Sequence, residues 1–398
     1  MSHALCIEVR QRSDSSAAAA EVRDAVAEHM RSDALLAHWT SSEFLAAHVD
    51  RICIDGEGEL QDAPAIYVYQ PCTLDNVDEF SIGDPAEALD SVAASVSELP
   101  NRAHDGLWES LVYGDRVKWD LLDYIHTTLV FSDALVDPHV IGCNRLVLLH
   151  GPPGTGKTSL CRALAQKLAI RLGAQYTHGK LVEINSHSLF SKWFSESGKL
   201  VQRLFEMVSE LVDDESGFVV VLIDEIESLT KARASAAAGT EPSDSLRVVN
   251  ALLTQLDRLK HRKNALVMTT SNLTDAIDPA FLDRADIRQY IGPPGPPAVY
   301  AILRSCVHEL MRTGLASPPM TIPAWQHAEA AASAPGTGAA DAATEAAVRL
   351  HGLASQCSAH GASGRSLRRL PVLAHARYLR SKDLLGWIDA IGAASRDL

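Results

Sequence analysis

The chain has 398 residues, 46% of them hydrophobic and 22% charged, which excludes a disordered or fibrous protein and leaves room for two or three folded domains. Seven widely spaced cysteines without a CxxC pair exclude a disulfide framework and a zinc knuckle, and they indicate a reducing compartment. The net charge of −14 comes from residues 1–98, with 19 acidic and 5 basic side chains, because the other 300 residues contain 31 of each. Nucleic acid is therefore not expected as a direct partner, since its phosphates are bound by clustered Lys and Arg.

The sequence carries no signal for secretion or for a membrane span. The amino terminus, MSHALCIEVR, lacks a charged stretch followed by a long apolar run. No run of about 18 apolar residues occurs elsewhere. We expect no membrane partner.

Residues 1–98 read as a small mixed α/β domain followed by a linker. Ala4–Val9 and Ala65–Tyr69 alternate in polarity like strands, and Glu21–Trp39 has apolar residues at helical spacing. Asp75–Pro100 is acidic with scattered Gly and Pro, which is typical of a linker.

A larger α/β domain is predicted over residues 99–294. The apolar runs LVLLH from Leu146, LVEI from Leu181, FVVVLI from Phe218 and ALVMTT from Ala265 alternate with helical segments. Strands that are continuously apolar are buried on both faces, as in a parallel sheet covered by helices.

After the proline-rich stretch 292–297, only helical patterns remain, so we predict a small helical lid domain over residues 295–398. Within it, a low-complexity segment near 324–363 is rich in Ala, Gly, Ser and His. We expect part of that segment to be poorly ordered.

The motif GPPGTGKT at 151–158 lies between a predicted strand and a predicted helix, the context of a P-loop. Its backbone N–H groups would wrap the phosphates of ATP, Lys157 would reach the β and γ phosphates, and Thr158 would ligate Mg²⁺. The alternative is a chance glycine turn. The predicted nucleotide-binding residues are Gly151, Pro152, Pro153, Gly154, Thr155, Gly156, Lys157, Thr158 and Ser159.

Acidic and amide side chains follow the next two apolar strands. Asp224 would hold the ATP-bound Mg²⁺, and Glu225 would act as the general base toward the attacking water. Asn272, at the end of the following strand, would orient that water beside the γ-phosphate. The alternatives are an ordinary acidic strand end and an ordinary turn asparagine.

Two other chemistries find no support in the sequence. The segment His308–Arg312 lacks the second histidine of HExxH, and the 16 histidines form no metal-ligand spacing. No G-x-S-x-G nucleophile elbow occurs. We predict neither a transition-metal site nor a serine hydrolase.

The segment KWFSESGK at 192–199, followed by Arg203-Leu204-Phe205, resembles the pore-loop region of AAA ATPases. In those hexamers an aromatic pair lines the central channel and grips polypeptide. The resemblance makes Trp193 and Phe194 the candidate substrate-gripping residues, with Lys192 beside them. The alternative is that both aromatic rings are core packing.

The P-loop, SHSLFSKWFSESGK, LIDEIESL, GTEPSDSLRVVNALLTQLD, DRADIRQYIGPP and SGRSLRRLP together resemble the pachytene checkpoint protein 2 family. The resemblance is dense over residues 107–297 and returns at 361–378. It implies an ATP-driven homo-hexamer that partially unfolds HORMA-domain proteins of the spindle checkpoint and the meiotic chromosome axis. It also implies a substrate-receiving N-terminal domain, often with a HORMA-like adaptor, and a protein of the nucleus and cytoplasm that associates with chromosomes.

The resemblance also assigns two arginines to the ATP site. Arg284 lies in the arginine-finger region, although the RPGR segment of many AAA relatives is missing here, and Arg288 is an alternate. Arg365 resembles the sensor-2 arginine of the lid, with Arg368 one turn along as its alternate. The alternatives are that Arg284 pairs with Asp283 or Asp286 and that the lid arginines are solvated helix cations. Family position places the adenine against residues 111–114.

Two rival functions remain open at this point. A nucleic-acid motor or clamp loader uses the same nucleotide machinery, but the chain has no basic face or DNA-binding module. A scaffold that binds ATP only for assembly would not need Glu225 or Asn272, which serve turnover.

Overall fold

The computed structural model describes residues 5–32, 38–56, 64–72, 78–81, 92–114, 116–134, 136–137, 140–186, 197–227, 244–273, 277–333 and 341–397. No helix within these ranges is both long and apolar enough to cross a membrane.

The N-terminal domain is a three-stranded sheet covered by helices, which confirms the mixed α/β prediction. Strand β1 (Cys6–Gln11) lies between β2 (Val49–Asp55), to which it is antiparallel, and β3 (Ala65–Tyr69), to which it is parallel. Helices α1 (Ala19–Ser32) and α2 (Glu43–His48) supply the rest of the core. Helix α1 ends before Trp39, which lies in a short 3-10 helix at 39–41. The core residues are Ile7, Val9, Val22, Val26, Leu45 and Val49.

The central domain is built on a seven-stranded sheet of order β10-β6-β9-β8-β7-β5-β4. Strands β7, β8 and β9 pair in parallel, as the continuously apolar runs predict. Strand β8 is buried from Gly217 to Ile223. The bounds are β4 Asp78–Ser81, β5 Val92–Leu99, β6 Leu146–His150, β7 His178–Asn185, β8 Gly217–Asp224, β9 Ala265–Ser271 and β10 Ile287–Tyr290.

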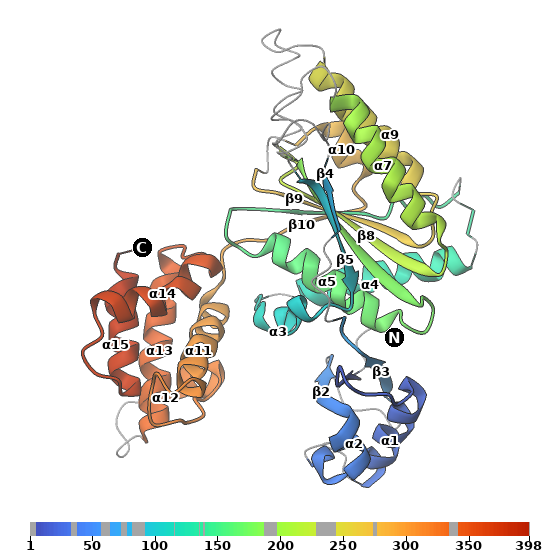
Figure 1. Ribbon diagram of the computed structural model, residues 1–398. Helices are drawn as coiled ribbons and strands as arrows, with labels where there is room; N and C mark the ends of the chain where they lie inside the picture. The colour runs from blue at the N-terminus through green and yellow to red at the C-terminus, as the bar shows by residue number, and fades with distance from the viewer. Residues whose placement is uncertain are drawn as a thin grey trace. The chain divides into compact units, whose positions relative to one another are not determined.

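Helices cover both faces of this sheet. Figure 1 shows α7 and α9 together on one face, with α4 and α5 on the other. Helices α7 and α9 are strongly amphipathic, and their apolar sides pack on the inward side chains of the strands. The bounds are α3 Leu107–Ser110, α4 Val117–Asp133, α5 Lys157–Arg171, α7 Ser197–Asp213, α9 Asp244–Leu259 and α10 Pro279–Arg284, with a 3-10 turn at Arg102–His104.

The expected linker at 75–100 is wrong, because its described residues form two strands of the central sheet, β4 near its start and β5 at its end. Strand β5 pairs antiparallel with β7, from Ala94 opposite Ile184 to Leu99 opposite Gly179, and β4 pairs with β5. The acidic residues around 84–90 suggested a linker, but the strand that follows them buries Ala93, Ala94, Val96 and Leu99. Two strands that end at or before residue 99, the expected start of the large α/β domain, are therefore part of the sheet of that domain.

The C-terminal domain is a helical bundle, as predicted. Its helices are α11 Pro296–Arg312, α12 Trp325–Ser333, α13 Ala342–Ala359, α14 Gly364–Arg377 and α15 Leu384–Ser395. Side chains of Asp341, Ser363 and Asp383 cap the starts of α13, α14 and α15.

The low-complexity segment 324–363 is largely helical where it is described. Helix α13 buries Leu350, Leu353 and Ala354 in the lid core. The expectation that part of the segment is poorly ordered stays a prediction. Residues 334–340 lie outside the described ranges.

A buried cluster of charges joins the N-terminal sheet to helix α5. Lys167 on α5 lies 2.5 Å from Glu8 and 3.1 Å from Asp55, and Arg171 lies 2.8 Å from Asp55. Burial raises the pKa of Glu8, an effect that Lys167 opposes. Trp108 lies beneath the Lys167 ammonium, 5.6 Å from ring centroid to nitrogen. The Cys6, Glu8 and Asp55 ligand atoms lie within 4.8 Å of one another, but the two cations already balance their charge.

Candidate active site

The loop between β6 and α5 has a backbone that requires glycine. Gly151, Gly154 and Gly156 have φ values of 140°, 78° and 94°, which side chains rarely permit. A Cβ on Gly151 would collide with the carbonyl oxygen of Ile291, and one on Gly154 would lie 2.9 Å from the Ser363 hydroxyl. The glycines therefore allow both the turn and its close contact with neighbouring chain.

Lys157 is buried and spans this loop. Its ammonium donates hydrogen bonds to the carbonyl oxygens of Gly151 and Pro152, both at 2.8 Å, and the Thr155 hydroxyl donates to Pro152 at 3.0 Å. The side chain is thus held over the concave loop, where a P-loop lysine meets phosphate.

Residues 109–117, the P-loop and the lid form one compact unit. The Arg365 backbone N–H donates to the Gly154 carbonyl at 3.1 Å, and the Tyr113 hydroxyl donates to the Gly156 carbonyl at 3.5 Å. The predicted sensor-2 arginine and the predicted adenine segment therefore both lie at the P-loop. Arg368 instead directs its guanidinium to the carbonyl of Ser110.

The second half of the predicted site is at the ends of β8 and β9. Asp224 accepts a hydrogen bond from the Thr270 hydroxyl, and the same oxygen of Thr270 accepts from the Glu225 N–H at 3.1 Å. The Asn272 amide donates to the Glu225 carboxylate at 3.3 Å. The parallel register of β8 and β9 thus brings together the predicted base and the predicted water-orienting residue.

The sequence interpretation missed two residues that surround this pair. Thr270 contacts both Asp224 and Glu225, and the Ser186 hydroxyl donates to their carbonyl oxygens. Both are small hydroxyl residues at strand ends, and the only signal for them was the position of each beside a strand that leads into the site.

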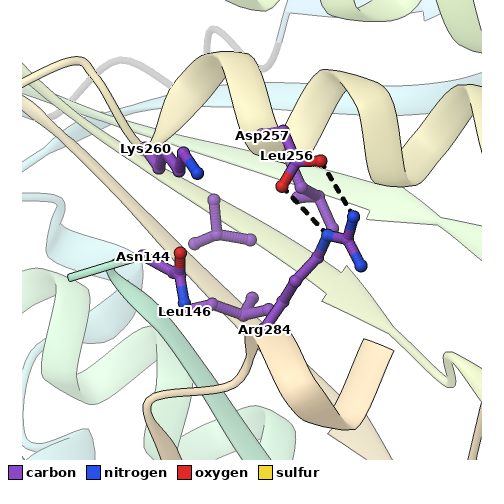
Figure 2. Close-up of a pocket in the computed structure, with 7 residues that line it drawn as sticks. Asn144, Leu146, Leu256, Asp257, Lys260 and Arg284 are labelled. Carbon is purple, nitrogen blue, oxygen red and sulfur yellow. Dashed lines mark hydrogen bonds and ion pairs between the residues drawn. The ribbon is translucent and has the colours of Figure 1, made fainter. Parts of the chain in front are cut away.

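Arg284, the predicted arginine finger, is paired within its own chain (Figure 2). Its guanidinium makes two hydrogen bonds of 2.9 Å to the carboxylate of Asp257 on α9, and it donates to the Ala280 carbonyl at 2.7 Å. The hydrogen bond from Arg284 lowers the pKa of Asp257.

The alternative partners of Arg284, Asp283 and Asp286, do not hold it. Asp286 instead accepts hydrogen bonds from Tyr124 and Asn144. Arg288 donates to the Leu282 carbonyl at 2.6 Å. Arg284 and Asp257 line a small pocket with Asn144, Leu146, Leu256, Lys260 and Val267.

The predicted pore-loop residues Lys192, Trp193 and Phe194 lie outside the described residues. The prediction for them stays a prediction.

Comparison with known proteins accounts for nearly the whole chain. Residues 147–293 match the ATPase family associated with various cellular activities (AAA), residues 295–394 match a TRIP13-like AAA+ ATPase lid C-terminal domain, and residues 1–75 match a TRIP13 N-terminal domain. The pachytene checkpoint protein 2 homolog of Sus scrofa is 46% identical over 405 residues, covering 98% of this chain and 92% of that protein. The chain belongs to the pachytene checkpoint protein 2 family.

Other members and solved structures agree with this assignment. The Homo sapiens homolog is 43% identical over 98% of this chain and 91% of its own length. The structure of C. elegans PCH-2 has a TM-score of 0.78 at 32% identity and covers 99% of this chain and 98% of that chain.

A more distant structure shares the fold. A structure of an E. coli MS115-1 HORMA:CdnC:Trip13 complex contains a chain with a TM-score of 0.56 at 20% identity, covering 75% of this chain and 94% of that one. As a member of this family with the AAA domain, the protein is an ATPase that binds ATP.

Proposed function

We propose that this ATPase works as a homo-hexameric ring that partially unfolds HORMA-domain proteins, in spindle-checkpoint and meiotic chromosome-axis control. The observation that carries the proposal is the set of three family matches, because the N-terminal domain and the lid both match TRIP13-type domains and not only the shared AAA domain. The E. coli complex, in which a Trip13 chain occurs with a HORMA protein, supports the substrate class.

In this proposal the P-loop binds the phosphates of ATP, and the residues at the ends of β8 and β9 activate the attacking water. Lys157 and the loop N–H groups bind the β and γ phosphates. Glu225 accepts the proton of the attacking water, and Asn272, already hydrogen-bonded to Glu225, orients that water.

Thr158 and Asp224 would hold a magnesium ion, because a hydroxyl and a carboxylate are the oxygen ligands that Mg²⁺ prefers. The Thr270 hydroxyl donates to the Asp224 carboxylate and orients it. When bound with ATP, the ion supplies neutralisation of the phosphate charge.

Each site in the ring would be shared between neighbours. Arg284 would leave Asp257 to stabilise charge on the γ-phosphate bound by the next subunit. Arg365 would report the state of the nucleotide to the lid, because its backbone already bonds the P-loop.

The remaining parts would handle substrate. The N-terminal domain would receive the HORMA protein with a HORMA-like adaptor, and Lys192, Trp193 and Phe194 would grip the chain in the central channel. Such a protein would act in the nucleus and cytoplasm, in association with chromosomes.

The test is steady-state ATP hydrolysis by the purified chain, measured alone, with a HORMA-domain protein and its adaptor, and with DNA. We expect stimulation by the protein pair and none by DNA. The Glu225→Gln variant serves as the control for contaminating ATPases. Stimulation by DNA alone would leave the nucleotide site standing and would refute the proposed substrate class.

A further inference from the structure

The backbone of Glu225 is in a conformation that its side chain does not favour. Its φ is 57°, in the left-handed region, which costs a residue with a Cβ about 1–3 kcal/mol unless the surroundings enforce it. Asp224 before it is half-buried and Ile226 after it is buried, whereas Glu225 is exposed. The left-handed turn is what directs the carboxylate outward at the end of a buried strand.

Two hydroxyl residues hold this turn from opposite sides. From β9, Thr270 bonds the Glu225 N–H at 3.1 Å, and its carbonyl accepts from the Ile226 N–H at 3.0 Å. From the end of β7, the Ser186 hydroxyl lies 2.6 Å from the Asp224 carbonyl oxygen and 2.9 Å from that of Glu225. Ser186 is fully buried, so water cannot easily replace its hydrogen bond.

Strand register explains why Ser186 is the residue in this place. Asn185, the last residue of β7, is opposite Asp224, the last residue of β8. The residues that follow the two strands are Ser186 and Glu225, so the register places the serine beside the turn. An alanine would fill nearly the same space without a donor.

We infer that Ser186 is a positioning residue for ATP hydrolysis, which holds the Asp224–Glu225 backbone in the left-handed turn that presents the Glu225 carboxylate. The inference rests on the proposed role of Glu225 as general base. Ser186 itself touches neither phosphate nor water in this account. Its loss should therefore lower turnover and leave ATP binding intact.

The experiment compares kcat, KM and the ATP dissociation constant for Ser186→Ala, Ser186→Thr, Glu225→Gln and the double variant Ser186→Ala with Glu225→Gln. We expect Ser186→Ala to lower kcat about tenfold, the effect of losing one buried hydrogen bond, with an unchanged dissociation constant. Ser186→Thr keeps the hydroxyl and should recover part of the rate. Ser209→Ala is the matched control, because that hydroxyl also donates to a carbonyl, of Phe205 at 2.6 Å, on a helix outside the site.

The double variant distinguishes positioning from a general structural role. If Ser186 acts through the Glu225 carboxylate, its removal should cause no further loss of single-turnover rate in the Glu225→Gln background. An equal fold-loss in both backgrounds, or a parental kcat for Ser186→Ala, would overturn the inference. Failure of the proposed base would appear separately, as a parental rate for Glu225→Gln alone.

Discussion

Arg284 and Asp257 illustrate how exposure sets the strength of a single contact. Their side chains are 28% and 40% exposed, and pairs that water reaches contribute only about 0–1 kcal/mol. In the proposed ring, a phosphate bound by the neighbouring subunit could therefore compete for the guanidinium. The two parallel hydrogen bonds seen in Figure 2 keep the arginine ordered until then.

His150, which directly precedes the P-loop, gives a prediction about pH. Burial and the nearby Lys157 ammonium lower the pKa of His150 from its ordinary value. Between that lowered value and about 6.5, the unfolded chain binds a proton that the folded chain does not, so stability rises with pH through this window and is lost as pH falls. His150→Gln should show a shallower fall of Tm between pH 7.5 and 5.5 than the parent. Parallel curves for the two proteins would contradict the assignment.

At the scale of elements, the charge cluster that joins β1 and β2 to α5 predicts a large effect of one substitution. Lys167 and Glu8 have side chains 3% and 5% exposed. Lys167→Met would remove the nearest cation from the buried Glu8 carboxylate, which keeps only Arg171 at 3.8 Å; breaking such a buried pair costs about 3–5 kcal/mol. Chemical denaturation should report a loss of that order.

A second variant separates charge from packing in this cluster. Adding Glu8→Leu to Lys167→Met removes the orphaned carboxylate and should recover part of the lost stability. Arg312→Ala, which breaks an exposed pair with Glu309 on α11, is the control and should change little. Unaltered stability of Lys167→Met would show that the cluster is not buried in solution.

How far the sequence predicts each element depends on where its partners lie. Strands β6 to β9 were predicted because continuous apolar runs need no knowledge of neighbours. Strand β5 was missed because the segment before it is acidic and because only its pairing with β7 makes it a strand. Helix α13 was not predicted because its segment is rich in alanine and glycine, and such residues occur both in flexible segments and in packed helices.

The same reasoning applies to the site. Gly151, Lys157, Asp224 and Glu225 follow a local pattern and could be placed from sequence. Ser186 and Asp257 could not, because their partners are 38 and 27 residues away in the chain and are brought close only by strand register and helix packing.

At the scale of the whole molecule, the proposed sharing of sites between subunits predicts that two inactive variants can restore each other. A Glu225→Gln subunit retains Arg284, and an Arg284→Ala subunit retains Glu225. Where the two variants are neighbours in a mixed ring, the site with Glu225 from one subunit and Arg284 from the other is complete. Mixed rings should hydrolyse ATP faster than either variant alone, as measured after co-refolding or co-expression. If Arg284 acts only within its own chain, mixing will give no gain.

The most direct test of the central claim is hydrogen exchange in a HORMA-domain protein incubated with this ATPase, an adaptor and ATP. We predict that wild-type protein strips protection from one terminal segment of the substrate, while Glu225→Gln and Trp193→Ala leave that segment protected although both still bind ATP. Protection that stays unchanged with the wild-type protein, under conditions where ATP is being hydrolysed, would contradict the account.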